Sequence, residues 1–339
     1  MVRKHLTPKG DERFCRCGSW IEFFSDEEER KFKVNNADFC CHRFCPVCMW
    51  RQARRDAMKI AVMMDYLEQE KGRAFVFATF TAKNVTGAEL PAQVDRFNVA
   101  FRNLVKREDI MRMNDGYIRK LEITYNGDER ITQEYYVKAK GYCRRRGLKV
   151  GDVNPNYDTY HPHFHVIFSV TRGYFSGGRY VKRDTWLRHW RELMGDDGIT
   201  MLDVRKVQRG DVREASGEFD MKGTDTNGKG KRKSVRDTRF EIAKYAAKDA
   251  DFMQSQSVFD VFYKSLHGRQ LLTYGGCFKD ANLLYKKKEL DHYKTEDTTE
   301  YIYLIFYRWA SEYVEQKRRL IDGAEYYELK KSALDESPM

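Results

Sequence analysis

The chain has 339 residues, of which 41% are hydrophobic and 14% are aromatic, a composition that supports a packed core and argues against wholesale disorder. Its length allows about two domains. Lysine and arginine number 62 against 51 aspartates and glutamates, for a net charge of +11. Basic surfaces capture phosphates by releasing counterions, so the charge favours a nucleic-acid partner, although a merely basic protein would show the same balance.

The sequence contains neither a membrane span nor an export signal. No stretch approaches the roughly 20 apolar residues that a spanning helix needs. The N-terminus, MVRKHLTPKGDERF, lacks the apolar segment of a signal peptide. We therefore expect a cytoplasmic protein, in which the eight cysteines are better suited to metal binding than to disulfides.

Hydrophobic periodicity predicts an alternation of strands and helices along the chain. The expected elements are a helix at 46–70, a strand at 73–81, a helix at 90–107, strands at 117–125 and 161–170, a helix at 184–193 that Asp184 would cap, a strand at 201–208, helices at 238–252 and 257–268, and a mostly helical, charged tail from about residue 282. The middle of the chain therefore predicts an α+β fold, with helices flanking a central antiparallel sheet.

Two segments interrupt this alternation. Residues 126–160 separate two expected strands and contain the basic run CRRRGLK, and residues 209–237 are rich in glycine and charge. We expect both to be exposed insertions or mobile loops. The domain division that follows is a cysteine-rich region with its helix at 1–70, an α+β domain at 71–256 and a helical C-terminal region at 257–339.

Six of the eight cysteines lie close together in the sequence: Cys15, Cys17, Cys40, Cys41, Cys45 and Cys48. A structural zinc ion takes four ligands in a tetrahedron, and the C-x2-C pair in CPVC can supply two of them. Cys40 or Cys41 would supply the third thiolate. Cys15 or Cys17 would supply the fourth. The pattern predicts a structural zinc site, with a set of free thiols as the alternative.

The expected strand at 161–170 contains the alternating sequence HPHFHVIF. Side chains on a strand alternate between faces, so His163 and His165 would point to one face, roughly 7 Å apart, and Phe164 into the core. Two imidazoles suit a divalent metal, and Glu122 on the neighbouring strand is the candidate carboxylate that would adapt the site to Mg²⁺ or Mn²⁺. His161 has the same parity but lies at the strand edge, so we leave it out.

The helix expected at 238–252 contains FEIAKYAAKD. Glu241 and Tyr245 are one turn apart on one face, so the carboxylate can act as a general base for the phenol or for water. Lys248 shares that face and could stabilise a phosphorane-like transition state. Glutamate and tyrosine have this spacing in many non-catalytic helices, so the pair gains meaning only beside the predicted metal site.

In this order, the motifs CCHRFCPVCMWRQARRDA, RKLEITY, HPHFHVIF and FEIAKYAAKDADF resemble plasmid rolling-circle replication initiators of the Gram-positive, single-tyrosine type. These proteins belong to the HUH endonuclease superfamily, named for two histidines around a bulky hydrophobic residue. The resemblance extends from about residue 15 to 310 and includes FYKSLHGRQLLTYGG and TEYIYLIFYRWA. It implies that the α+β region is an HUH endonuclease domain.

The resemblance also implies a role for each site residue. His163 and His165 would hold the divalent ion, with Glu122 as the third ligand. Tyr245 would attack the scissile phosphate of single-stranded DNA, keep the 5′ end as a phosphotyrosine and leave a 3′-OH primer. Glu241 would help water to make the final cut. The partners implied are plasmid double-strand origin DNA, a host helicase and a DNA polymerase, while the oligomeric state stays open, a homodimer included.

For the zinc site, the resemblance favours the ligand set Cys17, Cys40, Cys45 and Cys48. Cys15 and Cys41 are additional to the family pattern and leave the choice of ligands open. Two other functions fit parts of the sequence. A nucleotide hydrolase of the histidine-triad kind would use a histidine nucleophile, and a zinc-stabilised DNA-binding regulator would bind DNA without cutting it.

Overall fold

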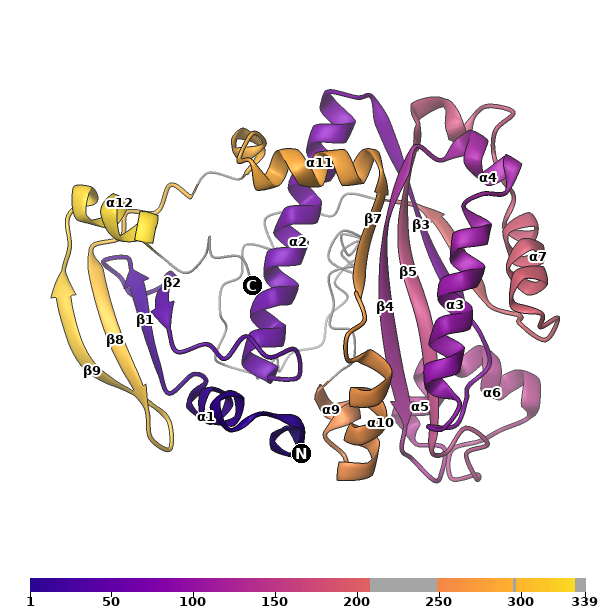
Figure 1. Ribbon diagram of the computed structural model, residues 1–339, viewed down its shortest axis with the longest axis horizontal. Helices are drawn as coiled ribbons and strands as arrows, with labels where there is room; N and C mark the ends of the chain where they lie inside the picture. The colour runs from indigo at the N-terminus through magenta and orange to yellow at the C-terminus, as the bar shows by residue number, and fades with distance from the viewer. Residues whose placement is uncertain (208–248, 295–296, 333–339) are drawn as a thin grey trace, which may run out of the picture. The chain divides into compact units, whose positions relative to one another are not determined.

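The computed structural model describes residues 1–207, 249–294 and 297–332 (Figure 1). Contacts group these residues into two compact units, which we describe separately. In the described part of the chain, the first unit comprises residue 1 with 56–207 and 249–293, and the second comprises 2–55 and 294–332. Among the described residues, no helix is both long enough and apolar enough to cross a membrane.

The first unit is built on an antiparallel sheet with the strand order β6-β3-β5-β4-β7. The strands are β3 (Arg73–Thr81), β4 (Gly116–Asn126), β5 (Thr159–Thr171), β6 (Leu202–Lys206) and β7 (Leu272–Gly276). The first four coincide closely with the strands expected from apolar alternation, whereas β7 was not predicted. The expected α+β class with a central antiparallel sheet is confirmed.

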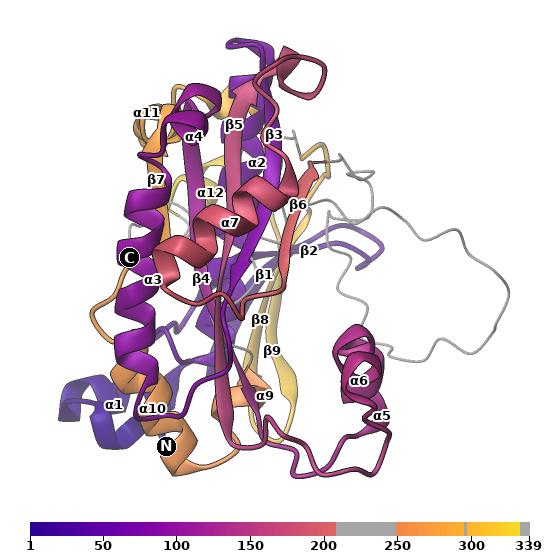
Figure 2. The ribbon, with the colours of Figure 1, turned by 90° about the vertical axis from the view of Figure 1, so that its right-hand side faces the viewer.

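One face of this sheet is covered by α3 (Leu90–Leu104), α4 (Glu108–Met113) and α7 (Arg183–Met194), as Figure 2 shows. Apolar residues at helical spacing along α3 are buried against the strands. The Phe97 ring lies 5.3 Å from the Phe164 ring of β5, and Trp190 of α7 lies 4.9 Å from Phe80 of β3. Phe164 therefore points into the core, as the strand parity predicted.

The opposite face is covered by α2 (Pro46–Gln69) and α11 (Cys277–Lys286) (Figure 1). Ile60, Met63 and Leu67 of α2 are buried together with Phe77 and Ile167 of the sheet. Toward one end, this face changes from apolar to polar, because the same alternating positions of β4 and β5 continue as glutamate and histidine. The candidate metal site lies on this polar part.

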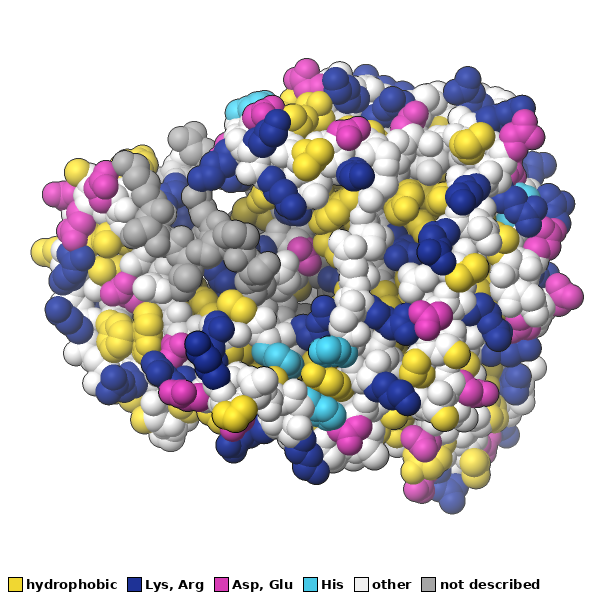
Figure 3. Space-filling view, viewed as in Figure 1, with side chains coloured by type: hydrophobic (Ala, Val, Ile, Leu, Met, Phe, Trp, Pro, Cys, Tyr) yellow, Lys and Arg dark blue, Asp and Glu magenta, His cyan; other side chains and the backbone are white. Residues whose placement is uncertain are grey.

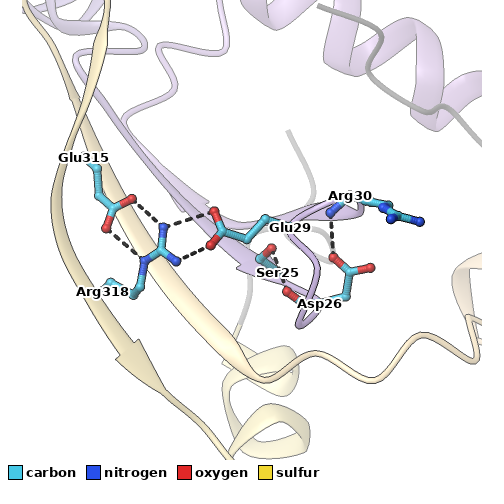
Figure 4. Close-up of polar contacts among 6 residues, drawn as sticks. All are labelled: Ser25, Asp26, Glu29, Arg30, Glu315 and Arg318. Atoms are coloured by element: carbon cyan, nitrogen blue, oxygen red, sulfur yellow. Dashed lines mark hydrogen bonds and ion pairs between the residues drawn. The ribbon is translucent and has the colours of Figure 1, made fainter.

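The second unit is built on another antiparallel sheet, with the order β2-β1-β8-β9. Its strands are β1 (Trp20–Ser25), β2 (Phe32–Ala37), β8 (Tyr303–Trp309) and β9 (Tyr313–Leu320), and its helices include α1 (Pro8–Arg16) and α12 (Gly323–Ser332). Tyr326 of α12 packs against Phe24 with ring centroids 4.9 Å apart. In Figure 4, Arg318 of β9 pairs with Glu315 and with Glu29 of the β1–β2 turn.

The prediction of a helical C-terminal region is wrong for the β8–β9 hairpin. YLIFYRW is a short apolar run, which periodicity alone cannot assign to a helix or a strand. YVEQKRRL forms an exposed outer strand, so neither of its faces needs the apolar alternation that marks a half-buried strand. The three-part domain division stays a proposal, although β7, taken as part of the C-terminal region, pairs with β4.

Smaller differences concern the ends of helices and the insertions. Asp184 does not cap α7: the N-cap is Lys182, no side chain caps the helix, and Asp184 lies in the first turn. The helix α10 (Gln256–Leu266) ends before Gly268, and the hydroxyl of Ser255 caps it. Of the helix expected at 238–252, only α9 (Asp249–Phe252) is described, and the insertion at 209–237 lies outside the described residues. The remaining elements are α5 (Gln133–Lys138), α6 (Lys140–Arg146), η1 (Val2–His5), η2 (Arg172–Phe175) and η4 (Asp291–Tyr293).

Candidate metal centres

The predicted metal-binding residues of β4 and β5 come together on the polar part of the sheet face. Glu122 pairs in register with His163, and its Oε2 lies 3.5 Å from His163 Nε2 and 3.0 Å from His165 Nε2. The three potential ligand atoms all lie within 4.8 Å of one another. Two imidazole nitrogens and one carboxylate oxygen form a donor set that fits a divalent cation and leaves coordination positions for a substrate.

The carboxylate of Glu122 is charged despite being only 8% exposed. Burial alone would raise the pKa of this group, but the hydrogen bonds from His163 and His165 outweigh burial and hold the pKa well below its usual range. The site therefore keeps a negative charge on a largely apolar sheet. A buried charge of this kind is costly unless cationic or hydrogen-bonding partners balance it, which is the situation of a metal ligand.

Both histidine rings are oriented by neighbours on their other ring nitrogen. His165 Nδ1 lies 3.2 Å from the hydroxyl of Thr79, and the ring of Phe77 stacks on His165 at 5.6 Å. His163 Nδ1 lies 3.3 Å from the carbonyl oxygen of His161. With Nδ1 held by these partners, Nε2 of each ring faces Glu122, so both Nε2 atoms are placed to act as metal ligands.

A buried lysine that was not predicted from the sequence lies beside this triad. Lys120 stands opposite His165 in the sheet, is only 6% exposed and reaches Asp56 of α2 at 4.0 Å. Burial lowers the pKa of Lys120, and the nearby carboxylates of Asp56 and Glu122 oppose that effect. The alternation in RKLEITY puts Lys120 on the same face as Glu122, so the strand pattern could have identified it.

His161 is close to the triad but differs from it in surroundings. Its ring lies 5.5 Å from that of His163. Burial and the proximity of His163 lower the pKa of His161 to about 4, so this imidazole is neutral at physiological pH. The three potential ligands that the structure brings together are Glu122, His163 and His165, without His161.

Four of the clustered cysteines converge in the second unit. The sulfur of Cys17 lies 3.5 Å from that of Cys48 and 3.4 Å from that of Cys45, and Cys40 lies 3.7 Å from Cys48. α2 begins at Pro46, which places Cys45 and Cys48 around its first turn. Cys15 and Cys41 are exposed, with their sulfurs 3.8 Å from Asp11 and 3.9 Å from the Phe39 carbonyl. The geometry thus brings together the four thiols that the family pattern favoured.

Two of the four sulfurs accept hydrogen bonds from the backbone. The backbone N–H of Cys40 points to the sulfur of Cys17, and that of His42 to the sulfur of Cys40, each at 3.4 Å. Hydrogen bonds among the four thiols lower the pKa of Cys40 and Cys45 and raise the pKa of Cys17 and Cys48. Four converging sulfurs with no remaining position are the donor set of a closed, structural zinc site rather than a catalytic one.

Comparison with known proteins decides the family. A sequence model of the replication-protein family matches residues 31–321. The chain belongs to this family. The Rep protein of Staphylococcus aureus is 31% identical over 76% of this chain and 90% of its own length. Those of Bacillus amyloliquefaciens and Streptococcus pneumoniae are 30% and 28% identical, over 81% and 84% of this chain and 72% and 74% of their own. No solved structure matches the chain.

Three residues expected to act in catalysis lie outside the described part of this replication protein: Glu241, Tyr245 and Lys248. In α9, the next described element, Asp251 accepts a hydrogen bond from the backbone N–H of Tyr125 at 3.4 Å. Tyr125 is three residues beyond Glu122 on β4. Asp251, six residues after Tyr245, therefore lies at the end of β4 that carries the candidate metal site.

Loss of two cysteine ligands should destabilise the replication protein. We expect purified wild type to contain about one zinc ion, and Cys45→Ser with Cys48→Ser to lower the melting temperature by roughly 10 °C, because a structural zinc contributes several kcal/mol to folding. Metal analysis and thermal unfolding check both points. The matched control is Cys15→Ser with Cys41→Ser, whose exposed thiols lie outside the cluster and should leave both measurements unchanged. A zinc-free wild type of full stability would refute the assignment.

Proposed function

We propose that this replication protein initiates rolling-circle replication of a plasmid by nicking one strand of the origin with a tyrosine nucleophile. The observation that carries the proposal is the convergence of Glu122, His163 and His165 on one face of the sheet. Family membership and the net charge of +11 point to DNA as the substrate. Lysine and arginine side chains are spread over the face of the molecule in Figure 3.

The three ligands have a defined task in this reaction. Glu122, His163 and His165 would hold Mg²⁺ or Mn²⁺, which when bound neutralises the charge of the scissile phosphate and polarises its phosphorus. The outer partners of the histidines, including Thr79, keep the nitrogen lone pairs directed at the site. Buried Lys120 adds a positive charge on the same sheet face, which favours an anionic phosphate there.

Tyr245 would make and keep the covalent bond. Its phenol oxygen attacks phosphorus as its proton leaves to a base, the bond to the 3′ oxygen breaks, and that oxygen takes up a proton. Lys248 would stabilise the charge that develops on the phosphoryl oxygens. The products are a 5′-phosphotyrosine and a free 3′-OH, which a host polymerase would extend while a host helicase unwinds the plasmid in the cytoplasm. Reversal of the step joins the strand without ATP.

Glu241 would complete the cycle by activating water for the final cut. Glu241→Gln keeps the shape of the side chain and removes the base, so we expect near-normal formation of the first tyrosyl adduct. Hydrolytic release of a second oligonucleotide should slow by about 10²- to 10⁴-fold. Sequential single-turnover reactions with two differently labelled oligonucleotides measure the two steps separately. An equal loss in both steps would show that Glu241 serves the metal site or Tyr245 instead.

The proposal is tested by incubating the protein with a labelled single-stranded origin oligonucleotide and Mn²⁺, followed by a denaturing gel. We expect a shortened DNA product together with a protein-linked species, both absent in EDTA. Specific binding without cleavage would support a zinc-stabilised regulator instead. Unchanged cleavage in EDTA would remove the role of the Glu122 site.

A further inference from the structure

The insertion between β4 and β5 is an ordered structure rather than a loose loop. Ile131 and Cys143 are buried within it. Its two ends are joined where the backbone N–H of Ile131 donates to Asp152 and that of Gly151 to Ile131, each at 2.8 Å. Buried Asn154 donates to the carbonyl oxygen of Asp128 at 2.9 Å. The helices α5 and α6 are therefore held in a fixed place on the first unit.

The insertion lies at the end of the sheet that carries the candidate metal site. Asn126 and Thr159 form the last pair of β4 and β5, so the insertion starts where these two strands end. The pair of Glu122 and His163 lies four residues back along the same strands, which is about 13 Å at the usual rise per residue. A DNA strand whose phosphate lies at the metal site therefore has the insertion within reach of its neighbouring nucleotides.

In the insertion, the acidic side chains make internal contacts and most of the basic side chains are exposed without an ionic partner among the described residues. Its acidic groups serve internal contacts: Asp152 caps the backbone N–H of Lys149, Asp158 accepts from the hydroxyl of Tyr125, and Glu134 pairs with Lys138. Arg130 and Lys138 make internal contacts, whereas the other exposed cations form no ion pair with a described residue: Lys140, Arg144, Arg145, Arg146 and Lys149. A favourable helix dipole accounts for one or two cations at the end of α6, but not for this excess.

We propose that α6 binds the phosphate backbone of the single-stranded DNA that flanks the cut. Exposed arginines without carboxylate partners are suited to bidentate contacts with phosphate oxygens. Such contacts position a strand without reading its sequence, so α6 would hold the DNA while other surfaces select the origin. This inference rests on the proposed function, because it places the DNA relative to the Glu122 site.

The test compares two triple variants of the full chain. In the first, Arg144, Arg145 and Arg146 are each changed to glutamine. In the control, Arg102, Lys106 and Arg188 are changed to glutamine. Arg102 and Arg188 lie on α3 and α7, which cover the face of the sheet opposite the Glu122 site, and Lys106 follows α3; all three are exposed. Fluorescence anisotropy measures the affinity for a single-stranded oligonucleotide with flanks of about 16 nucleotides, the upper end of common site sizes. EDTA keeps the strand uncut.

Loss of three phosphate contacts should reduce the slope of log affinity against log salt by about 2, at roughly 0.7 per contact on single strands. At low salt we expect the α6 variant to bind at least tenfold more weakly than the control variant. A third variant with lysine at the same three positions should keep the wild-type slope, because the charges remain. It also separates a charge effect from a folding defect.

Three results would overturn the inference: equal slopes for the α6 and control variants, the same reduction of the slope in the lysine variant, or a loss confined to duplex DNA. The proposed function is judged separately by wild-type cleavage with Mn²⁺. An α6 variant that binds weakly beside a wild type that does not cut would support the DNA contact and reject the nuclease.

Discussion

His163→Ala with His165→Ala should abolish metal-dependent cleavage of single-stranded DNA, with a loss of at least about 10³-fold. The reason is that both imidazole nitrogens within 4.8 Å of the Glu122 oxygen disappear, and one carboxylate alone cannot hold the ion. A metal ion contributes several kcal/mol to the transition state, and each 1.36 kcal/mol is about a factor of ten in rate. Single-turnover cleavage with Mn²⁺ measures the loss.

DNA binding should persist in this double variant, because phosphate contacts are made by other residues. The matched control is His267→Ala with His292→Ala, two exposed histidines outside the site, which should cut like wild type. Titration with Mn²⁺ provides a second measurement, since only the His163 and His165 variant should lose tight metal binding. Cleavage retained by that variant, or lost equally by the control, contradicts the metal site.

Tyr245→Phe should remove the covalent protein–DNA adduct altogether. The substitution deletes only the phenol oxygen, so folding, metal binding and DNA binding are expected to be unchanged. We expect no other side chain to form the ester with the 5′ phosphate. In the first cut, no base is expected to activate water in place of the phenol. A denaturing gel with labelled oligonucleotide measures the adduct.

Tyr263→Phe serves as the control for this experiment. Tyr263 belongs to α10, and its ring stacks on His267, away from the three metal-binding residues. This variant should form the adduct at the wild-type yield. If Tyr245→Phe also forms it at that yield, Tyr245 is not the nucleophile.

Local patterns were sufficient to predict the central strands of the first unit's sheet. The first half of β5 alternates strictly, and this parity correctly placed Phe164 in the core and the two histidines on the opposite face. The start of α2 at Pro46 followed from the proline and the helical spacing after it. Such features depend on a few neighbouring residues, which is why a single sequence reveals them.

Features that depend on distant contacts could not be predicted. Lys120 gains its partner Asp56 only when α2 packs on the sheet. β8 could not be recognised as a strand because its partner, β1, lies nearly the whole chain away. Spacing alone left Cys15 and Cys17 as alternatives; the family resemblance favoured Cys17, and the structure brings that thiol to the cluster.

The most direct test of the proposed reaction is the identity of the bond between protein and DNA. Wild-type protein is incubated with a single-stranded origin oligonucleotide and Mn²⁺, digested with protease and nuclease, and analysed by mass spectrometry. We predict a nucleotide linked through a 5′-phosphotyrosine at Tyr245, absent from the His163→Ala, His165→Ala variant. A nucleotide on a histidine, or cut DNA with no protein-linked nucleotide at any stage of the reaction, would contradict a tyrosine-dependent initiator.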